Sequence, residues 1–259
     1  MFRPALATLV LTLAAHAAGA QERDDSAWHG LVASGARVRI YNYRGAVTVR
    51  PAPAGEMTVV GTPRGGSTDA MRAEVHETSD GWVVCVAEPG IWCDAGGMHS
   101  VGGVALDTTR HDAPRVDLLV RVPAGVRLSA SSVSGDVTMT AVEGDVTART
   151  VTGDVRLSGL RVSRARAATV SGHLSLAFDQ LTGNEELRFA SVSGDIALDL
   201  PAETDADLQV ATVDGSIQAD IAVTGERADA NGLSGRLGRG GRALRLLTVS
   251  GDLRVRGAQ

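Results

Sequence analysis

One position of a repeated phrase gathers the residues that could do chemistry in this chain. The phrase reads VSGDV at residues 133–137, and seven variants of it follow as far as residue 253. A regular repeat would bring equivalent positions into one column, and aligned carboxylates can act as general acids and bases or as ligands of a hard cation. The position directly after the glycine holds Asp136, Asp145, Asp154, His173, Asp195, Ser216, Arg236 and Asp252.

Three interpretations of this column differ in what the carboxylates do. A carbohydrate-active enzyme of the β-helix kind would use Asp154, His173 and Asp195 as acid and base on a cell-wall or extracellular polysaccharide. A calcium-binding β-roll would need the pattern GGxGxDxUx, whereas here a single glycine precedes the aspartate. We favour the third interpretation, in which aspartate is a solvated residue that suits the turn-like backbone beside glycine. The enzyme stays open as the alternative.

Other groups of polar residues give weaker signals. His99 and His111 form a pair in a Gly-rich stretch, without the spacing of a metal site. The chain lacks the motifs GxSxG, HExxH and GxGxxG. We expect no catalytic residue, no metal and no cofactor. The candidates for binding are Asp136, Asp154, His173, Asp195 and Arg236.

A basic cluster lies near the C-terminus, in the sequence GRLGRGGRALR. It contains Arg236, Arg239, Arg242 and Arg245. Aromatic residues are not interleaved with these arginines, and the formal net charge of the chain is -5, so we expect no nucleic-acid site. The pattern favours a solvated edge that caps the open end of the fold, because charged residues discourage edge-to-edge strand pairing.

The elements that must position these residues are short β-strands. Apolar residues alternate at period two around each phrase, as in Leu187, Phe189, Ile196 and Leu198. We expect the valine and the glycine of the phrase to face inward, with a corner or bulge between Phe189 and Val192. Spacings near 20 residues predict an all-β fold, a parallel β-helix or β-solenoid in which consecutive coils stack. The shorter spacing to Gly144 suggests an extra half-coil.

The N-terminus and the two cysteines indicate export. Residues 1–20 are typical of a secretory signal peptide, so the mature protein would begin at Gln21, soluble in the periplasm or outside the cell. No cysteine lies at the cleavage site, so we expect no lipoprotein anchor, and no later apolar run predicts a transmembrane segment. Cys85 and Cys93 flank a Pro89-Gly90 turn and should form a disulfide, with a metal or redox pair as the alternative.

We expect two regions after the signal peptide. Residues 21–122 would be a β region of degenerate coils, with a hairpin at Asp80-Gly81 and an excursion loop over residues 94–114. Residues 123–259 would hold the regular solenoid repeats.

The order of the phrases resembles a known family. The sequences RVRIYNYRGAVTVR, VDLLVRVPAGVRLSASSVSGDV and LSGRLGRGGRALRLLTVSGDLRV are similar to a bacterial family of unknown function labelled "putative adhesin", over residues 36–256. The resemblance implies a secreted β-solenoid and offers no catalytic residues. We therefore expect a non-enzymatic secreted or envelope-associated protein with an adhesin-like binding or structural role, whose partner is an envelope polymer or protein.

Overall fold

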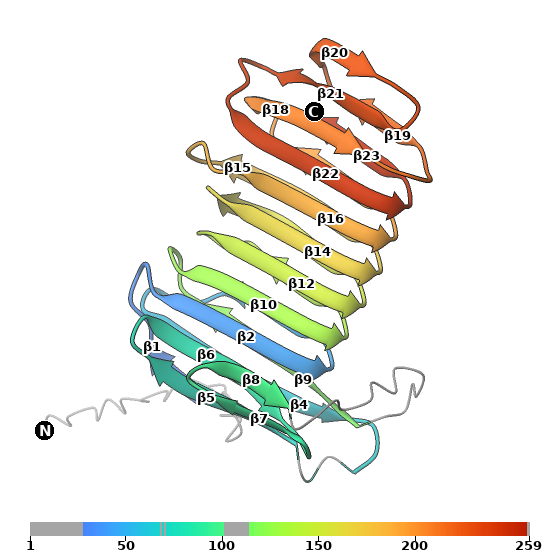
Figure 1. Ribbon diagram of the computed structural model, residues 1–259. Helices are drawn as coiled ribbons and strands as arrows, with labels where there is room; N and C mark the ends of the chain where they lie inside the picture. The colour runs from blue at the N-terminus through green and yellow to red at the C-terminus, as the bar shows by residue number, and fades with distance from the viewer. Residues whose placement is uncertain (1–27, 68, 70, 101–113, 258–259) are drawn as a thin grey trace, which may run out of the picture.

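Strands stacked into two parallel-stranded layers make up the fold (Figure 1). The computed structural model describes residues 28–67, 69, 71–100 and 114–257. The predicted signal peptide lies outside these residues. No helix occurs in the described part of the chain, and none there could therefore cross a membrane. The predicted all-β solenoid is confirmed.

The layer that faces the viewer in Figure 1 is an 11-stranded sheet, which we call the front sheet. In spatial order it contains β20 (Thr224–Ala228), β21 (Gly232–Leu237), β18 (Ala206–Ala211), β22 (Arg242–Ser250), β16 (Leu187–Ser193), β14 (Ala165–Ser171), β12 (Val146–Thr152), β10 (Arg127–Ser134), β2 (Arg37–Arg44), β6 (Gly81–Ala87) and β5 (Arg72–Thr78).

The second layer is a 10-stranded sheet, the back sheet. Its order is β1 (Trp28–Leu31), β4 (Glu56–Arg64), β9 (Arg115–Val122), β3 (Val47–Pro51), β11 (Val137–Thr140), β13 (Val155–Val162), β15 (Leu174–Leu181), β17 (Ile196–Leu200), β23 (Leu253–Gly257) and β19 (Ile217–Asp220). A separate hairpin consists of β7 (Ile91–Asp94) and β8 (Gly97–Ser100).

Each regular coil contributes one strand to each sheet, and the glycine of the repeated phrase makes the corner between them. In one coil, β16 runs through the front sheet, Gly194 turns the chain, and β17 enters the back sheet. Equivalent residues Leu128, Val146, Ala165 and Leu187 pair in register and form one layer of the core between the sheets. The first coil, β2 and β3, pairs with β10 and β11. A boundary at residue 122 stays a prediction.

The valine of the phrase points outward, contrary to our prediction. Val192 is 48% exposed, whereas Ser191 is 5% exposed and faces the core. Alternation is unbroken from Phe189 to Ser191, and the change of parity occurs at Gly194. The hydroxyl of Ser191 donates to the carbonyl of Gly172 at the corner. For this reason a polar residue takes the inward position that hydropathy predicts for valine.

Gly144 marks no extra half-coil. It lies at the opposite corner, between β11 and β12, where its N–H donates to the carbonyl of Arg161. Asp145, which follows it, therefore leaves the predicted column. Its side chain lies next to Ser163 and Arg164 instead.

The last coils do not stack in chain order. β22 and β23 insert between the levels formed by β16–β17 and β18–β19, so β18 pairs with β22 and not with β16. β21 runs antiparallel to β18 and extends the front sheet. The LSGRL copy of the phrase thus lies within β21, and Arg236 is not in the column.

Part of the predicted excursion loop is ordered sheet. Residues 97–100 form β8, which pairs antiparallel with β7, because the two-residue turn between them allows a short hairpin. Residues 101–113, including His111, lie outside the described residues. The Asp80-Gly81 hairpin is present as the antiparallel pair β5 and β6.

Candidate functional site

The structure brings most of the predicted column together along one edge of the stack. In Figure 1 the arrowheads of β10, β12, β14, β16 and β22 end along this edge, where the chain turns to the back sheet. In spatial order the residues after the glycine are Asp136, Asp154, His173, Asp195, Asp252 and Ser216. We call them the corner column.

Every side chain of the corner column except the last, Ser216, caps a backbone N–H of the next coil. Asp136 Oδ1 accepts from the N–H of Asp154 at 2.9 Å, and Asp154 Oδ1 accepts from the N–H of His173 at 2.8 Å. Further along, Asp195 Oδ1 accepts from the N–H of Asp252 at 2.8 Å. The carboxylates therefore satisfy donors that a sharp corner would leave without partners.

A cation lies between the first two carboxylates. Arg156 Nη1 is 2.6 Å from Asp136 Oδ2, and Arg156 Nη2 is 2.6 Å from Asp154 Oδ2. The hydrogen bond that Arg156 donates to Asp136 raises the pKa of the guanidinium. The repulsion expected between stacked acids is thus offset within the chain itself.

His173 continues the column by a different chemistry. Its Nδ1 accepts the N–H of Asp195 at 3.0 Å, so in this arrangement the ring proton resides on Nε2. Asp154, His173 and Asp195, the residues proposed for acid-base catalysis, are therefore neighbours. Their polar atoms, however, hold backbone amides, and the side chains of His173 and Asp195 are 62% and 56% exposed. This is the geometry of a structural ladder that faces solvent.

A hollow of about 310 Å³ lies beside this column, at Asp195, Asp252 and Arg254. Asp252 Oδ1 accepts from both the N–H and the hydroxyl of Ser216, at 2.8 and 2.9 Å. The acid at the hollow is therefore engaged, like the others. Among the described residues, no group of three or more His, Cys, Asp or Glu side chains could hold a metal ion.

A second ladder, of buried hydroxyls, runs beside the glycines, and the sequence analysis missed it. Each hydroxyl comes three residues before the glycine and donates to the carbonyl of the glycine in the preceding coil of the stack. The distances are 3.0 Å for Ser132 to Gly45, 2.8 Å for Thr150 to Gly135, 3.0 Å for Thr169 to Gly153, 3.3 Å for Ser191 to Gly172, 3.1 Å for Thr248 to Gly194 and 3.2 Å for Thr212 to Gly251. A serine or threonine three residues before the glycine, in six of the eight copies, was the available signal.

Three arginines of the C-terminal cluster are held by separate partners, and the fourth, Arg236, is exposed on β21. Arg239 pairs with Asp205 Oδ2 at 2.7 Å, and Arg245 pairs with Glu186 Oε1 at 2.6 Å. Arg242 is buried, and its Nη2 donates to the carbonyls of Thr182 and Gly183. Burial lowers the pKa of Arg242. The prediction of a solvated edge is wrong for Arg242, because the inserted β22 carries it into the stack.

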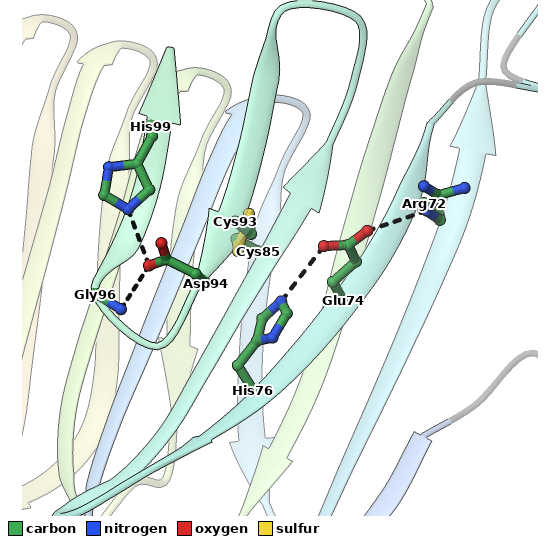
Figure 2. The surroundings of a disulfide bond; sticks show 8 residues. All are labelled: Arg72, Glu74, His76, Cys85, Cys93, Asp94, Gly96 and His99. Carbon is green, nitrogen blue, oxygen red and sulfur yellow. Dashed lines mark hydrogen bonds and ion pairs between the residues drawn. A yellow bond between two sulfur atoms is a disulfide. The ribbon is translucent and has the colours of Figure 1, made fainter.

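The disulfide holds the β7–β8 hairpin over the outer face of the front sheet (Figure 2). Cys85 of β6 is bonded to Cys93 of β7, as the sequence predicted. Beside it, His99 and Asp94 share a 2.9 Å hydrogen bond, and the N–H of Gly96 donates to the same carboxylate oxygen. These bonds lower the pKa of Asp94, that from His99 most. His99 therefore pairs within its own hairpin.

The hydrogen bonds that Asp252 accepts from Ser216 predict how the stability of the fold changes at acid pH. Hydrogen bonds from the N–H and then the hydroxyl of Ser216 lower the pKa of Asp252. Because the pKa is lower in the folded state, the contact stabilises the fold above the unfolded pKa, near about 4, and is lost as the pH falls through the folded pKa. We expect Asp252→Asn to lose less stability than the wild type between about pH 5 and pH 2.5, measured as the urea midpoint.

The matched control for this measurement is Glu203→Gln. Glu203 is exposed and has no hydrogen bond or ion pair within the described part of the chain. This variant should follow the wild-type curve. An Asp252→Asn curve that falls as steeply as the wild type would show that the contact contributes nothing.

The chain is similar to one protein family and to solved structures of low sequence identity. A family model described as Toastrack DUF4097 matches residues 100–256. No curated protein matches the chain. One solved structure, a "putative cell adhesion protein" from Clostridium sporogenes ATCC 15579, is similar at 10% identity and a TM-score of 0.45, over 90% of this chain and 99% of that one. A "putative adhesin" from Bacteroides fragilis NCTC 9343 is similar at 10% identity and a TM-score of 0.40, over 90% of this chain and 96% of that one.

Proposed function

The chain belongs to the Toastrack DUF4097 family, and we propose that it is a non-enzymatic, exported protein that acts by binding through an outer face of its solenoid. The role would be adhesin-like or structural, in the periplasm or at the cell envelope. The signal-like residues 1–20 and the Cys85–Cys93 disulfide support export, because disulfides persist in oxidising compartments.

One observation carries the proposal. The polar groups that might have done chemistry are engaged in the corner ladder, while apolar side chains stand exposed on the front sheet. Val192 and Val249 are 48% and 49% exposed although they belong to the most regular part of the repeat. Exposed apolar residues in a continuous row are a feature of interaction surfaces.

The alternative, a carbohydrate-active enzyme, is tested directly. Purified protein of residues 21–259 is incubated with cell-wall and extracellular polysaccharides, and reducing ends are measured. We expect no release above buffer. Release that disappears in the variant Asp154→Asn/His173→Asn/Asp195→Asn would overturn the proposal and establish catalysis at the corner column.

Binding is tested with the same protein immobilised and exposed to envelope extract from its own host. We expect a component to be retained and, once purified, to bind saturably in a titration. The matched control is an immobilised protein unfolded by reduction and alkylation in denaturant. Equal retention on both surfaces, or no saturable component, would count against a binding role.

A further inference from the structure

The front sheet carries an apolar outer face from β12 to β18. One column holds Val151, Val170, Val192 and Val249 on these strands and Val213 just after β18, exposed by 40%, 45%, 48%, 49% and 68%. A second column, two residues earlier, holds Ala168, Ala190, Leu247 and Ala211, which pair in register from β14 to β18, and its position on β12 is Arg149. We call the two columns together the valine face. In a solvated sheet these outward positions would normally be polar.

The same columns are covered at the other end of the sheet by the chain itself. Tyr41 of β2 is in register with Ser131 of β10 and so continues the second column. Tyr41 and Met98 of the β7–β8 hairpin both pack against the cluster of Val83, Cys85 and Cys93, and the disulfide holds the hairpin in place. The fold therefore covers this surface where its own hairpin reaches, and leaves it open from β12 onward.

Opposite charges flank the valine face along its two long sides. Arg166, Arg188 and Arg245 form an outward column two residues before the alanines and Leu247. Arg166 and Arg245 share the single acid Glu186, so the column keeps a net positive charge. Arg188 has no ion-pair partner within the described part of the chain. On the other side runs the corner column, with Asp154, Asp195 and Asp252. A basic edge and an acidic edge thus border one flat apolar strip.

We propose that the valine face binds the valine face of a second copy of this chain. A two-fold axis parallel to the stack would place the arginine column of each copy opposite the acidic corner column of the other. The two copies share one strand spacing of about 4.8 Å, so coils at the same level would face each other. The coils of β16 and β22 would then set Arg188 and Arg245 opposite Asp195 and Asp252. This inference rests on the proposed function in one respect: both hold that the protein acts through an outer face of the solenoid and not through a pocket.

The size of the face sets the expected strength of the dimer. Five strands at about 4.8 Å and six residues at about 3.4 Å give roughly 500 Å² of flat area for each copy. The total of roughly 1,000 Å² lies at the lower limit of specific protein interfaces. We therefore expect a reversible dimer with a dissociation constant on the order of micromolar, formed side by side and not end to end.

The test is sedimentation equilibrium of residues 21–259 over a range of protein concentrations. The wild type should be a dimer at about 100 μM, and Val192→Lys should raise the dissociation constant by at least about tenfold, because it buries an unpaired charge. Arg188→Glu should also weaken the dimer, by facing an acid with an acid. Val192 is already exposed, so Val192→Lys should keep the thermal midpoint of the wild type.

The matched control is Ser175→Lys, an exposed outward position on β15 of the back sheet, which should leave the dimer unchanged. A wild type that stays monomeric at about 100 μM, or a dimer equally weakened by Ser175→Lys, would overturn the inference. A monomer whose retention of an envelope component is lost on Val192→Lys would also overturn it, and would leave the proposed function standing with that component on the valine face.

Discussion

Gly172→Ala should destabilise the protein by about 3–5 kcal/mol, an effect as large as the loss of a large core side chain. Gly172 adopts φ +149, and a Cβ there would lie 1.9 Å from the carbonyl oxygen of Gly153 in the neighbouring coil. That carbonyl cannot retreat, because it accepts the hydroxyl of Thr169 at 3.0 Å. The substitution therefore forces two stacked corners apart at the centre of the solenoid.

The control variant, Gly55→Ala, separates the strain of a positive φ from the steric clash with the neighbouring coil. Gly55 adopts φ +77 in a turn where a Cβ would meet nothing within 4 Å. Gly55→Ala should cost only about 1 kcal/mol, the usual penalty of a side chain at positive φ. The free energies of unfolding come from urea titrations of both variants. Equal losses in the two would show that the close approach between corners contributes nothing to stability.

The glycines of the repeated phrase show how much of the fold can be predicted from the sequence. Their spacing was enough to predict an all-β solenoid with coils of about 20 residues, because a stacked fold repeats its corner once a coil. It also predicted that Asp136, Asp154, His173, Asp195 and Asp252 would lie in one column. It could not predict what the column does, since the partners of these side chains are backbone amides of the next coil. The amino-acid sequence does not show which backbone amides need a side-chain partner.

The error over Val192 has a physical cause as well. Hydropathy places valine inside and serine outside, and over most of a strand that preference decides the parity. At the corner, a buried glycine carbonyl needs a donor, and leaving it without one would cost about 1–3 kcal/mol. Ser191 supplies the hydroxyl and takes the inward position, so Val192 must face outward. The exposed valines are thus a consequence of how the corner is satisfied.

The order of the last coils was beyond prediction for a different reason. Parallel pairing requires only that neighbours share the template of inward and outward residues, and β16 and β18 both pair with β22 through this template. Sequence similarity between repeats therefore identifies the set of coils and leaves their order undetermined. The antiparallel β21 next to β18 is part of what distinguishes the observed order, because it covers the edge that β18 turns away from β22.

This order makes the removal of 18 C-terminal residues the second large effect that we expect. Truncation after Gly241 deletes β22 and β23, through which β18 and β19 pair with the rest of the stack. The three strands β18, β21 and β20 would be left as an isolated antiparallel sheet, which is marginal in water. Hydrogen exchange should therefore show residues 206–237 losing nearly all protection, while the coils from β2 to β15 keep theirs.

A larger deletion should destabilise the protein less than this truncation does. Comparing the two variants tests the order in which the coils stack. Excising residues 203–241 joins the end of β17 to β22 through a short loop, and β22 and β23 already pair with β16 and β17. The remaining coils would then follow one another in chain order, so we expect native protection from β2 to β23 at low micromolar concentration, where the newly open edges do not associate. Stacking in chain order would give the opposite result for the truncation, because β18 and β19 would stay paired with β16 and β17 and residues 206–220 would remain protected. The insertion of β22 and β23 thus makes the last residues of the chain the ones that hold its preceding coil in place.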